Sequence, residues 1–270
     1  MTTAATRLVG LLGHPVGHSA SPAIHTAAFA AAGLDAAYLA FDVAPDRLPA
    51  ALEGLAALGA LGANATVPHK RAVWEAAARR SPEAELVGAA NTLWWSDGEL
   101  AVDNTDASGL ERVLLDDVGL PRGAPVVLFG AGGAARAAAV ALGRLGAEVE
   151  VTARRAGPAA EVADLLSRAG GRPVERLAAP TLVVNATPLG LAGEALPDRF
   201  MDLAPGQTAL DLVYGPADTP FLAAAQAAGA AAHDGLGMLV EQAALAFERW
   251  TGLDAPREAM AAAAAEALRR

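Results

Sequence analysis

The sequence predicts a parallel α/β protein in which short buried strands alternate with helices that cover both faces of a sheet. Apolar runs of strand length recur along the chain, and longer helical segments follow them. Glycine or proline stands at many of the boundaries between the two. The 270 residues are 53% hydrophobic and 19% charged, so the chain is long enough for about two domains with sizeable cores.

The composition narrows the possible functions. The chain has no cysteine, which excludes disulfides, thiolate metal sites and a cysteine nucleophile. A formal net charge of −10 and the lack of a long basic run argue against a nucleic-acid partner. No apolar run is long enough to span a membrane, the start of the chain is too weak for a signal peptide, and the five histidines lack metal-ligand spacing. We therefore expect a cytoplasmic protein with no metal that binds small molecules rather than nucleic acids or membranes.

The start of the chain contains two strand-and-helix pairs. Ser21 followed by Pro22 is typical of an N-cap and a first helical position, and Gly33 is suited to end that helix. Gly59 ends the next helix in the same way. The expected elements are strands 8–12 and 38–43 and helices 21–32 and 45–58.

The stretch Asn64–Lys70 places an amide, a hydroxyl and a lysine around the start of a third helix. Pro68 suits the first helical position, which predicts a helix that runs on through Arg79. Lys70 then lies in the first turn, where the helix dipole favours anions over cations. Either Lys70 is an ordinary solvated lysine, or its charge serves chemistry.

A hairpin is predicted next, with strands 91–95 and 100–102 joined by the turn Ser96–Glu99. Asn104-Thr105-Asp106 then leads into a helix over 108–118. Asp106 is either a structural acid at the start of that helix or the carboxylate of an acid/base pair with Lys70. The pattern alone does not place the two side chains together.

A glycine-rich loop follows the boundary at 121–125. The strand 126–129 runs directly into Gly130–Ala135, which has the form G-x-G-x-x-A and opens an alanine-rich helix to about residue 145. Such a turn lets the backbone approach a pyrophosphate, whose charge the helix N-terminus stabilises. Further strands are expected at 148–152, 181–185 and 209–213, and helices at 236–250 and 256–270.

The end of the strand 148–152 indicates which dinucleotide binds. Arg154 lies 22 positions after Gly132, close to the roughly 20 expected for the residue that recognises the ribose. An acidic residue there would suit NAD, whereas Arg154 and Arg155 suit the 2′-phosphate of NADP. The alternative is a solvated arginine pair.

The chain resembles the shikimate dehydrogenases in motifs that follow one another over almost its whole length. In the N-terminal half these motifs are Ser19–Pro22, Gly62–Lys70, Gly88–Thr92 and Asn104–Asp106. In the C-terminal half they are Gly130–Ala135, Asn185–Pro188, Asp211–Pro216 and Gly235–Gln242. The chain departs from the family at Thr26 and Ala153, where asparagine is usual, and at Ala65, where valine is usual.

The resemblance implies a two-domain oxidoreductase. An N-terminal α/β substrate domain (1–104, completed by 237–270) and a Rossmann-type NADP-binding domain (105–236) would be separated by an active-site cleft. The implied reaction is the reversible NADPH-dependent reduction of 3-dehydroshikimate to shikimate, a step of chorismate and aromatic amino-acid biosynthesis. The state in solution stays open between monomer and homodimer.

The resemblance also assigns site residues. Lys70 and Asp106 would form the catalytic pair, and the two serines would hold the substrate carboxylate. The residues implied to bind the substrate are Ser19, Ser21, Asn64, Thr66, Asn91, Tyr214 and Gln242. The residues implied to bind the cofactor are Gly130, Ala131, Gly132, Gly133, Ala134, Arg154, Arg155, Thr187, Val213, Gly235 and Met238.

Proteins with other functions would share these motifs. A relative that acts on quinate or aminoshikimate would carry nearly all of them. A non-catalytic NADP-binding sensor on the same fold would bind the cofactor without turnover, but an intact Lys70 and Asp106 argue against it.

Overall fold

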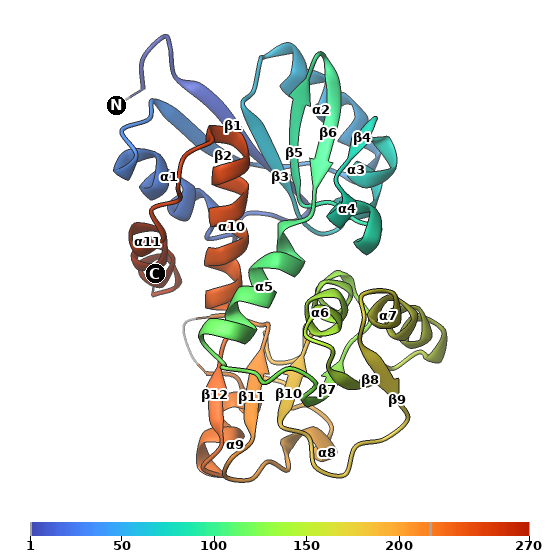
Figure 1. Ribbon diagram of the computed structural model, residues 1–270. Coiled ribbons are helices and arrows are strands. Elements are labelled where there is room, and N and C mark those ends of the chain that lie inside the picture. Colours follow the sequence, from blue (N-terminus) through green and yellow to red (C-terminus); the bar gives the residue numbers. More distant parts are fainter. Residues whose placement is uncertain (1, 216–217, 270) are drawn as a thin grey trace. The chain divides into compact units, whose positions relative to one another are not determined.

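The computed structural model describes residues 2–215 and 218–269. They form two compact units, Met1–Thr105 with Val240–Arg270 and Asp106–Leu239 (Figure 1). The chain passes between the units inside two helices, α5 (Thr105–Asp116) and α10 (Leu236–Thr251).

The first unit contains a six-stranded sheet in the order β2-β1-β3-β5-β6-β4. The strands β1, β2 and β3 are parallel, whereas β5 runs antiparallel to both β3 and β6, so the sheet is mixed rather than purely parallel. The predicted hairpin is β5 and β6, and its turn has positive φ at Asp97 and Gly98. The strands are β1 (Arg7–Gly13), β2 (Ala36–Asp42), β3 (Gly62–Ala65), β4 (Arg79–Arg80), β5 (Thr92–Ser96) and β6 (Glu99–Asp103).

Helices cover both faces of this sheet. Leu52 of α2 and Val73 of α3 pack with Ala63 and Leu93 on one face, whereas α1 and α10 lie on the other, where Trp250 donates a hydrogen bond from Nε1 to the Leu93 carbonyl (3.1 Å). The remaining elements of the unit are α1 (Ser21–Ala31), the 3₁₀ turn η1 (Pro45–Arg47), α2 (Leu48–Ala57), α3 (Lys70–Ala76), α4 (Pro82–Val87) and α11 (Arg257–Leu268).

Two details of the expected helices were wrong. The third helix begins at Lys70 rather than Pro68, and it ends at Ala76, because Arg79 and Arg80 pair with β6 as a short strand. Arg80 closes the helix by donating hydrogen bonds to the carbonyls of its last turn. Ser21 is not an N-cap but the first residue of α1, and its N–H donates to Ser19 Oγ (3.2 Å).

The second unit contains a sheet of six parallel strands in the order β12-β11-β10-β7-β8-β9. Numbered from β7, this order is 3-2-1-4-5-6, that of a dinucleotide-binding Rossmann fold. The strands are β7 (Pro125–Phe129), β8 (Glu148–Thr152), β9 (Arg172–Val174), β10 (Leu182–Asn185), β11 (Thr208–Asp211) and β12 (Ala231–His233).

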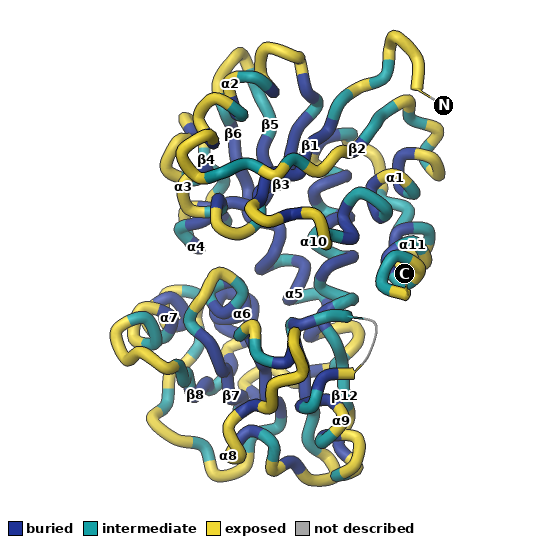
Figure 2. Tube along the Cα trace, turned by 180° about the vertical axis from the view of Figure 1, so that it is seen from behind, coloured by how far each residue is buried: buried dark blue, intermediate teal, exposed yellow. Residues whose placement is uncertain are grey.

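The helices of the second unit also lie on both faces of their sheet. Phe221 and Leu222 of α9 and Phe200 of α8 pack with Val127 and Val183 on one face, and α6 and α7 cover the other. The central strands β7, β10 and β11 are almost wholly buried, whereas β9 and β12 at the sheet edges are not, and exposed loops surround the sheet (Figure 2). The helices are α6 (Gly133–Arg144), α7 (Ala156–Arg168), α8 (Asp198–Met201) and α9 (Pro220–Ala227).

Candidate active site

Asn64 of β3 is the centre of a buried polar network in the first unit. Its side-chain amide donates to the Asn91 carbonyl (2.9 Å) and to Thr92 Oγ1 (3.2 Å). Its Oδ1 accepts a hydrogen bond from the Tyr38 hydroxyl (2.7 Å). Because these groups come from β2, β3 and the start of β5, tertiary pairing rather than local sequence sets the orientation of Asn64.

Asn91 links this network to two distant segments. Its Nδ2 donates to Thr105 Oγ1 (2.9 Å) and to Gln242 Oε1 (3.3 Å), and its Oδ1 accepts from the Thr105 N–H (2.8 Å). Three of the residues predicted to bind the substrate, Asn64, Asn91 and Gln242, are therefore close together in one unit.

The two predicted serines join the same network. Ser19 Oγ donates to Ser21 Oγ (3.1 Å), and the Ser21 side chain lies next to the Tyr38 hydroxyl. Burial raises the pKa of Tyr38, and the neighbouring Ser21 hydroxyl partly opposes this rise, so Tyr38 is a neutral phenol. We call Ser19, Ser21, Asn64, Asn91 and Gln242 the polar cluster; Tyr38 connects its serines to its amides.

Lys70 is held beside this cluster by its main chain. It is the first residue of α3, and its carbonyl accepts a hydrogen bond from the Ala90 N–H (2.9 Å), directly before Asn91. Thr66, half-buried, lies on the loop that enters α3, and its carbonyl accepts from the His69 N–H (2.7 Å). The imidazole of His69 is 1% exposed and bonded to the Val43 carbonyl (2.7 Å), which agrees with a structural role.

Asp106 is buried in the first turn of α5, one residue after Thr105, which Asn91 holds. It is the first residue of the second compact unit. The acid/base pairing of Asp106 with Lys70 stays a prediction.

In the second unit, the glycine-rich loop lies between β7 and α6. Gly130 has φ of +140°, and a Cβ there would come within 2.5 Å of the Ala186 carbonyl oxygen, so only glycine fits. Gly132 and Gly133 are exposed, and a Cβ on either would meet no atom of the described residues within 4 Å. The N-terminus of the 12-residue helix α6 is thus open to a ligand phosphate.

The other predicted cofactor residues follow the carboxyl ends of neighbouring strands. Arg154 and Arg155 are exposed directly after β8. Thr187 follows β10 and donates from Oγ1 to Asn185 Oδ1 (2.7 Å). Ligands of open parallel sheets bind at this edge, where the strand order reverses, here between β7 and β10.

Asp211 at the end of β11 organises the next loop. It accepts hydrogen bonds from Asn185 Nδ2 (2.8 Å), from the Val213 N–H (3.0 Å) and from Thr219 Oγ1 (2.6 Å). Burial raises the pKa of Asp211, and these hydrogen bonds oppose that rise.

The remaining predicted residues lie near this loop. Val213 and Tyr214 line a cavity of about 290 Å³. A Cβ on Gly235 would come within 2.4 Å of the Leu212 carbonyl oxygen, so the turn into α10 needs glycine, and Met238 lies half-buried in the first turn of that helix. Tyr214 belongs to the second unit, and its role in binding the substrate stays a prediction.

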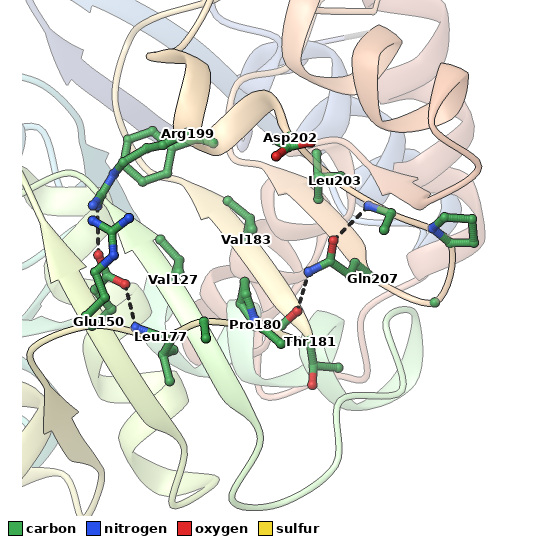
Figure 3. A pocket seen from close by; sticks show the side chains of 17 residues that line it. Val127, Glu150, Leu177, Pro180, Thr181, Val183, Arg199, Asp202, Leu203 and Gln207 are labelled. Atoms are coloured by element: carbon green, nitrogen blue, oxygen red, sulfur yellow. Dashed lines mark hydrogen bonds and ion pairs between the residues drawn. The ribbon is translucent and has the colours of Figure 1, made fainter.

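A larger cavity of the second unit, about 690 Å³, lies away from these residues (Figure 3). Its polar groups bond to each other: Glu150 accepts from Arg199 (2.8 Å) and from the Leu177 N–H (2.9 Å), and Gln207 donates to the Pro180 carbonyl (2.7 Å). This pairing indicates a structural role.

Among the described residues, no group of histidines and carboxylates could hold a metal, and no helix is long and apolar enough to cross a membrane.

Comparison with known proteins agrees with this geometry. Residues 11–93 match the model of the shikimate dehydrogenase substrate-binding domain, and residues 235–265 match that of the shikimate 5′-dehydrogenase C-terminal domain. The shikimate dehydrogenase (NADP(+)) of Citrifermentans bemidjiense is 43% identical over 98% of this chain and 97% of its own. The chain belongs to the shikimate dehydrogenase family.

Solved structures of the shikimate dehydrogenase fold extend the comparison. The Thermus thermophilus enzyme in complex with NADP(H) and shikimate is 39% identical, with a TM-score of 0.86 over 97% of this chain and 100% of that one. The ligand-free 5-ketofructose reductase of Gluconobacter sp. strain CHM43 is 33% identical, with a TM-score of 0.87 over 98% and 99%. Backbone similarity alone therefore does not separate these two activities.

Sequence reasoning missed Tyr38 and Thr105, which connect the polar cluster. In the sequence, Tyr38 is one residue of an ordinary strand, and Thr105 lies between two more conspicuous residues. Thr105 stands inside the motif Asn104–Asp106, but neither residue carries a local signal for its role, because their contacts depend on how β2 and α5 meet β3 and the residues around Asn91.

Proposed function

We propose that the protein is an NADP-dependent shikimate dehydrogenase that interconverts 3-dehydroshikimate and shikimate in the pathway to chorismate and the aromatic amino acids, in the cytoplasm. The observation that carries the proposal is the 43% identity, over nearly the full length of both chains, with a curated NADP-dependent enzyme of that activity. The polar cluster and the open glycine loop supply the chemistry that both ligands need.

The polar cluster suits a hydroxylated carboxylate. Two neighbouring hydroxyls, on Ser19 and Ser21, can turn to donate to a carboxylate at the start of α1. The side-chain amides of Asn64, Asn91 and Gln242 would bind ring hydroxyls, Asn64 through its Oδ1 as an acceptor, and we assign Thr66 to the same task. Tyr214 is proposed as a further contact to the carboxylate.

The second unit fits a phosphorylated dinucleotide. The open N-terminus of α6 and the loop Gly130–Ala134 would hold the pyrophosphate, and Arg154 and Arg155 the 2′-phosphate. The remaining contacts would come from Thr187, Val213, Gly235 and Met238. When bound, NADPH supplies the hydride that the carbonyl carbon of the substrate receives.

Lys70 is proposed to supply the proton. As an ammonium group at the start of α3, it can stabilise the alkoxide that develops on the substrate oxygen and then protonate it. Asp106 would orient the ammonium group. In the reverse direction, Lys70 accepts the hydroxyl proton.

A panel of substrates tests the proposal. NADPH oxidation is followed with 3-dehydroshikimate, 3-dehydroquinate and 5-ketofructose, each also with NADH. We expect the highest kcat/KM with 3-dehydroshikimate and NADPH. The similarity to 5-ketofructose reductase makes a different keto-polyol the second candidate, and a higher kcat/KM with 5-ketofructose would establish it. NADPH binding without turnover of any substrate would indicate a sensor.

The oligomeric state is proposed as a monomer or a homodimer. Sedimentation equilibrium decides between them.

A further inference from the structure

We infer that Tyr38 is a positioning residue of the substrate site, which fixes Asn64 so that its side-chain oxygen accepts a hydrogen bond from a substrate hydroxyl. The inference rests on the proposed function, because Asn64 is assigned to the substrate there. Tyr38 is not among the residues proposed to contact a ligand, and it acts on the substrate only through Asn64.

The first step is the orientation of the Asn64 amide. Its nitrogen has two N–H groups, and both have partners, the Asn91 carbonyl (2.9 Å) and Thr92 Oγ1 (3.2 Å). The Tyr38 hydroxyl donates to Oδ1 at 2.7 Å, and a flipped amide would set Oδ1 against the Asn91 carbonyl oxygen, so that two acceptors would face each other. Oδ1 can accept two hydrogen bonds and Tyr38 supplies one of them. The Asn64 side chain can therefore accept one further hydrogen bond from a ligand.

The second step is what holds Tyr38 in place. Its ring, 3% exposed, stacks on the imidazole of His25 with a centroid distance of 4.4 Å and an angle of 9° between the planes. Trp250 packs against both rings, with centroids 5.3 Å from His25 and 6.4 Å from Tyr38. The phenol is therefore fixed by contacts from α1 and α10, and its hydroxyl cannot leave Asn64 without disturbing them.

The third step concerns His25 itself. It is fully buried, and neither ring nitrogen has a hydrogen-bond partner among the described residues. Burial lowers the pKa of His25 to about 3, so the ring is neutral at physiological pH. A neutral, unbonded imidazole here serves as a flat surface for Tyr38 rather than as an acid, base or ligand.

The fourth step connects Tyr38 to the serines. Ser19 Oγ donates to Ser21 Oγ (3.1 Å), and the Ser21 hydroxyl lies close enough to the Tyr38 hydroxyl to lower the pKa of the phenol. When a substrate carboxylate accepts hydrogen bonds from the two serine hydroxyls, the Tyr38 hydroxyl still donates its hydrogen bond to Asn64. The amide thus stays oriented in both the free and the bound site.

The test is a double-mutant cycle of Tyr38→Phe and Asn64→Ala, after turnover by the wild-type enzyme has been measured. If the wild type does not reduce 3-dehydroshikimate, the proposed function fails, and the cycle is then run with the substrate that it does reduce. Leaving a buried acceptor without its donor costs binding, so Tyr38→Phe should raise the substrate KM by about 10-fold with a smaller change in kcat. The KM for NADPH should not change.

The Asn64→Ala background separates positioning from general damage. There, Tyr38→Phe should raise the substrate KM by less than about 2-fold, because the residue through which it acts is gone. An equal rise in both backgrounds, or no rise in the wild-type background, would overturn the inference.

Phe29→Leu is the matched control. Phe29 is buried beside the rings that hold Tyr38, with its ring centroid 5.8 Å from that of Phe247 and 6.2 Å from that of His25. Its side chain has no polar atom that could bond to the polar cluster. We expect a lower melting temperature with the substrate KM unchanged. A rise in KM as large as that of Tyr38→Phe would mean that loosened packing, and not the phenol hydroxyl, accounts for the effect.

Discussion

In the first unit, the residues assigned to the substrate are buried or half-buried and most are already bonded to one another, whereas in the second unit Gly132, Gly133 and the two arginines assigned to the cofactor are exposed. Asn64 and Asn91 are 6% and 2% exposed and have side-chain partners on several elements. Gly132, Gly133, Arg154 and Arg155 lie on the surface at the ends of a strand and a helix. The side chains proposed to bind the substrate are therefore ordered by hydrogen bonds before a ligand arrives. The groups proposed to bind the cofactor are exposed backbone and exposed arginine side chains.

The difference bears on specificity. A preset polar network rejects a ligand that leaves its buried groups unpaired, so the first unit suits discrimination among similar hydroxylated rings. An open helix N-terminus accepts many phosphates, and the choice of dinucleotide then depends on the few charges around it. Substitutions in the polar cluster should therefore act on substrate kinetics, and substitutions in the glycine loop or at the two arginines should act on cofactor kinetics.

The largest effect is expected at Lys70. Lys70→Ala should lower kcat by about two to four orders of magnitude, the range of general acid catalysis, with a much smaller change in KM. Steady-state rates with 3-dehydroshikimate and NADPH measure this. A kcat within a few-fold of wild type would remove Lys70 as the proton carrier, and Asp106→Asn should cost less if that carboxylate only orients the ammonium group.

The next effect concerns the cofactor. A charge-assisted contact with the 2′-phosphate contributes about 1.5–3 kcal/mol, which favours NADPH over NADH by roughly 10- to 100-fold. Arg154→Asp should raise the NADPH KM by about that factor and leave the NADH KM and the substrate KM nearly level. Equal use of both cofactors by the wild type would show that these arginines face solvent and bind no phosphate.

A smaller effect is expected from the serine pair. Substituting Ser19 and Ser21 together by alanine removes two hydroxyl donors, and the substrate KM should rise by about 10-fold or more. The NADPH KM should stay within about 2-fold, since the pair belongs to the other unit. A normal substrate KM would exclude the serines from the site.

The last effect concerns stability and should leave the kinetics at neutral pH unchanged. The pKa of His25 is about 3 in the folded protein and about 6.5 when unfolded, so between these values the unfolded chain binds more protons. Stability is therefore lost as the pH falls below 6.5, by up to about 1.4 kcal/mol per pH unit. Urea unfolding of the wild type and His25→Phe between pH 7 and pH 4.5 should show a steeper decline for the wild type. Parallel curves would mean that His25 takes up a proton in the folded state.

The same contrast explains what the sequence could predict. The strand β7, the glycine loop and the arginines after β8 were predicted because each motif is contiguous and its neighbours follow in order along the chain. The hairpin of β5 and β6 was predicted by its turn residues. Local signals were enough in both cases.

The polar cluster needed more than local signals. Gln242 is 151 positions from Asn91, and only the family resemblance placed them in one site before the structure showed their hydrogen bond. The helix expected through Arg79 was wrong because pairing of Arg79 and Arg80 with Ala101 and Val102 outweighed their helix propensity. Sheet pairing and buried networks depend on contacts that periodicity does not record.

Hydrogen–deuterium exchange with each ligand added singly tests the division between the two sites most directly. Shikimate should protect backbone amides at 19–21, 64–66 and 90–92, and NADP⁺ should protect those at 130–135 and in the loops after β8 and β10. Protection of the glycine loop by shikimate alone, or of residues 19–21 by NADP⁺ alone, would contradict the assignment of one ligand to each unit.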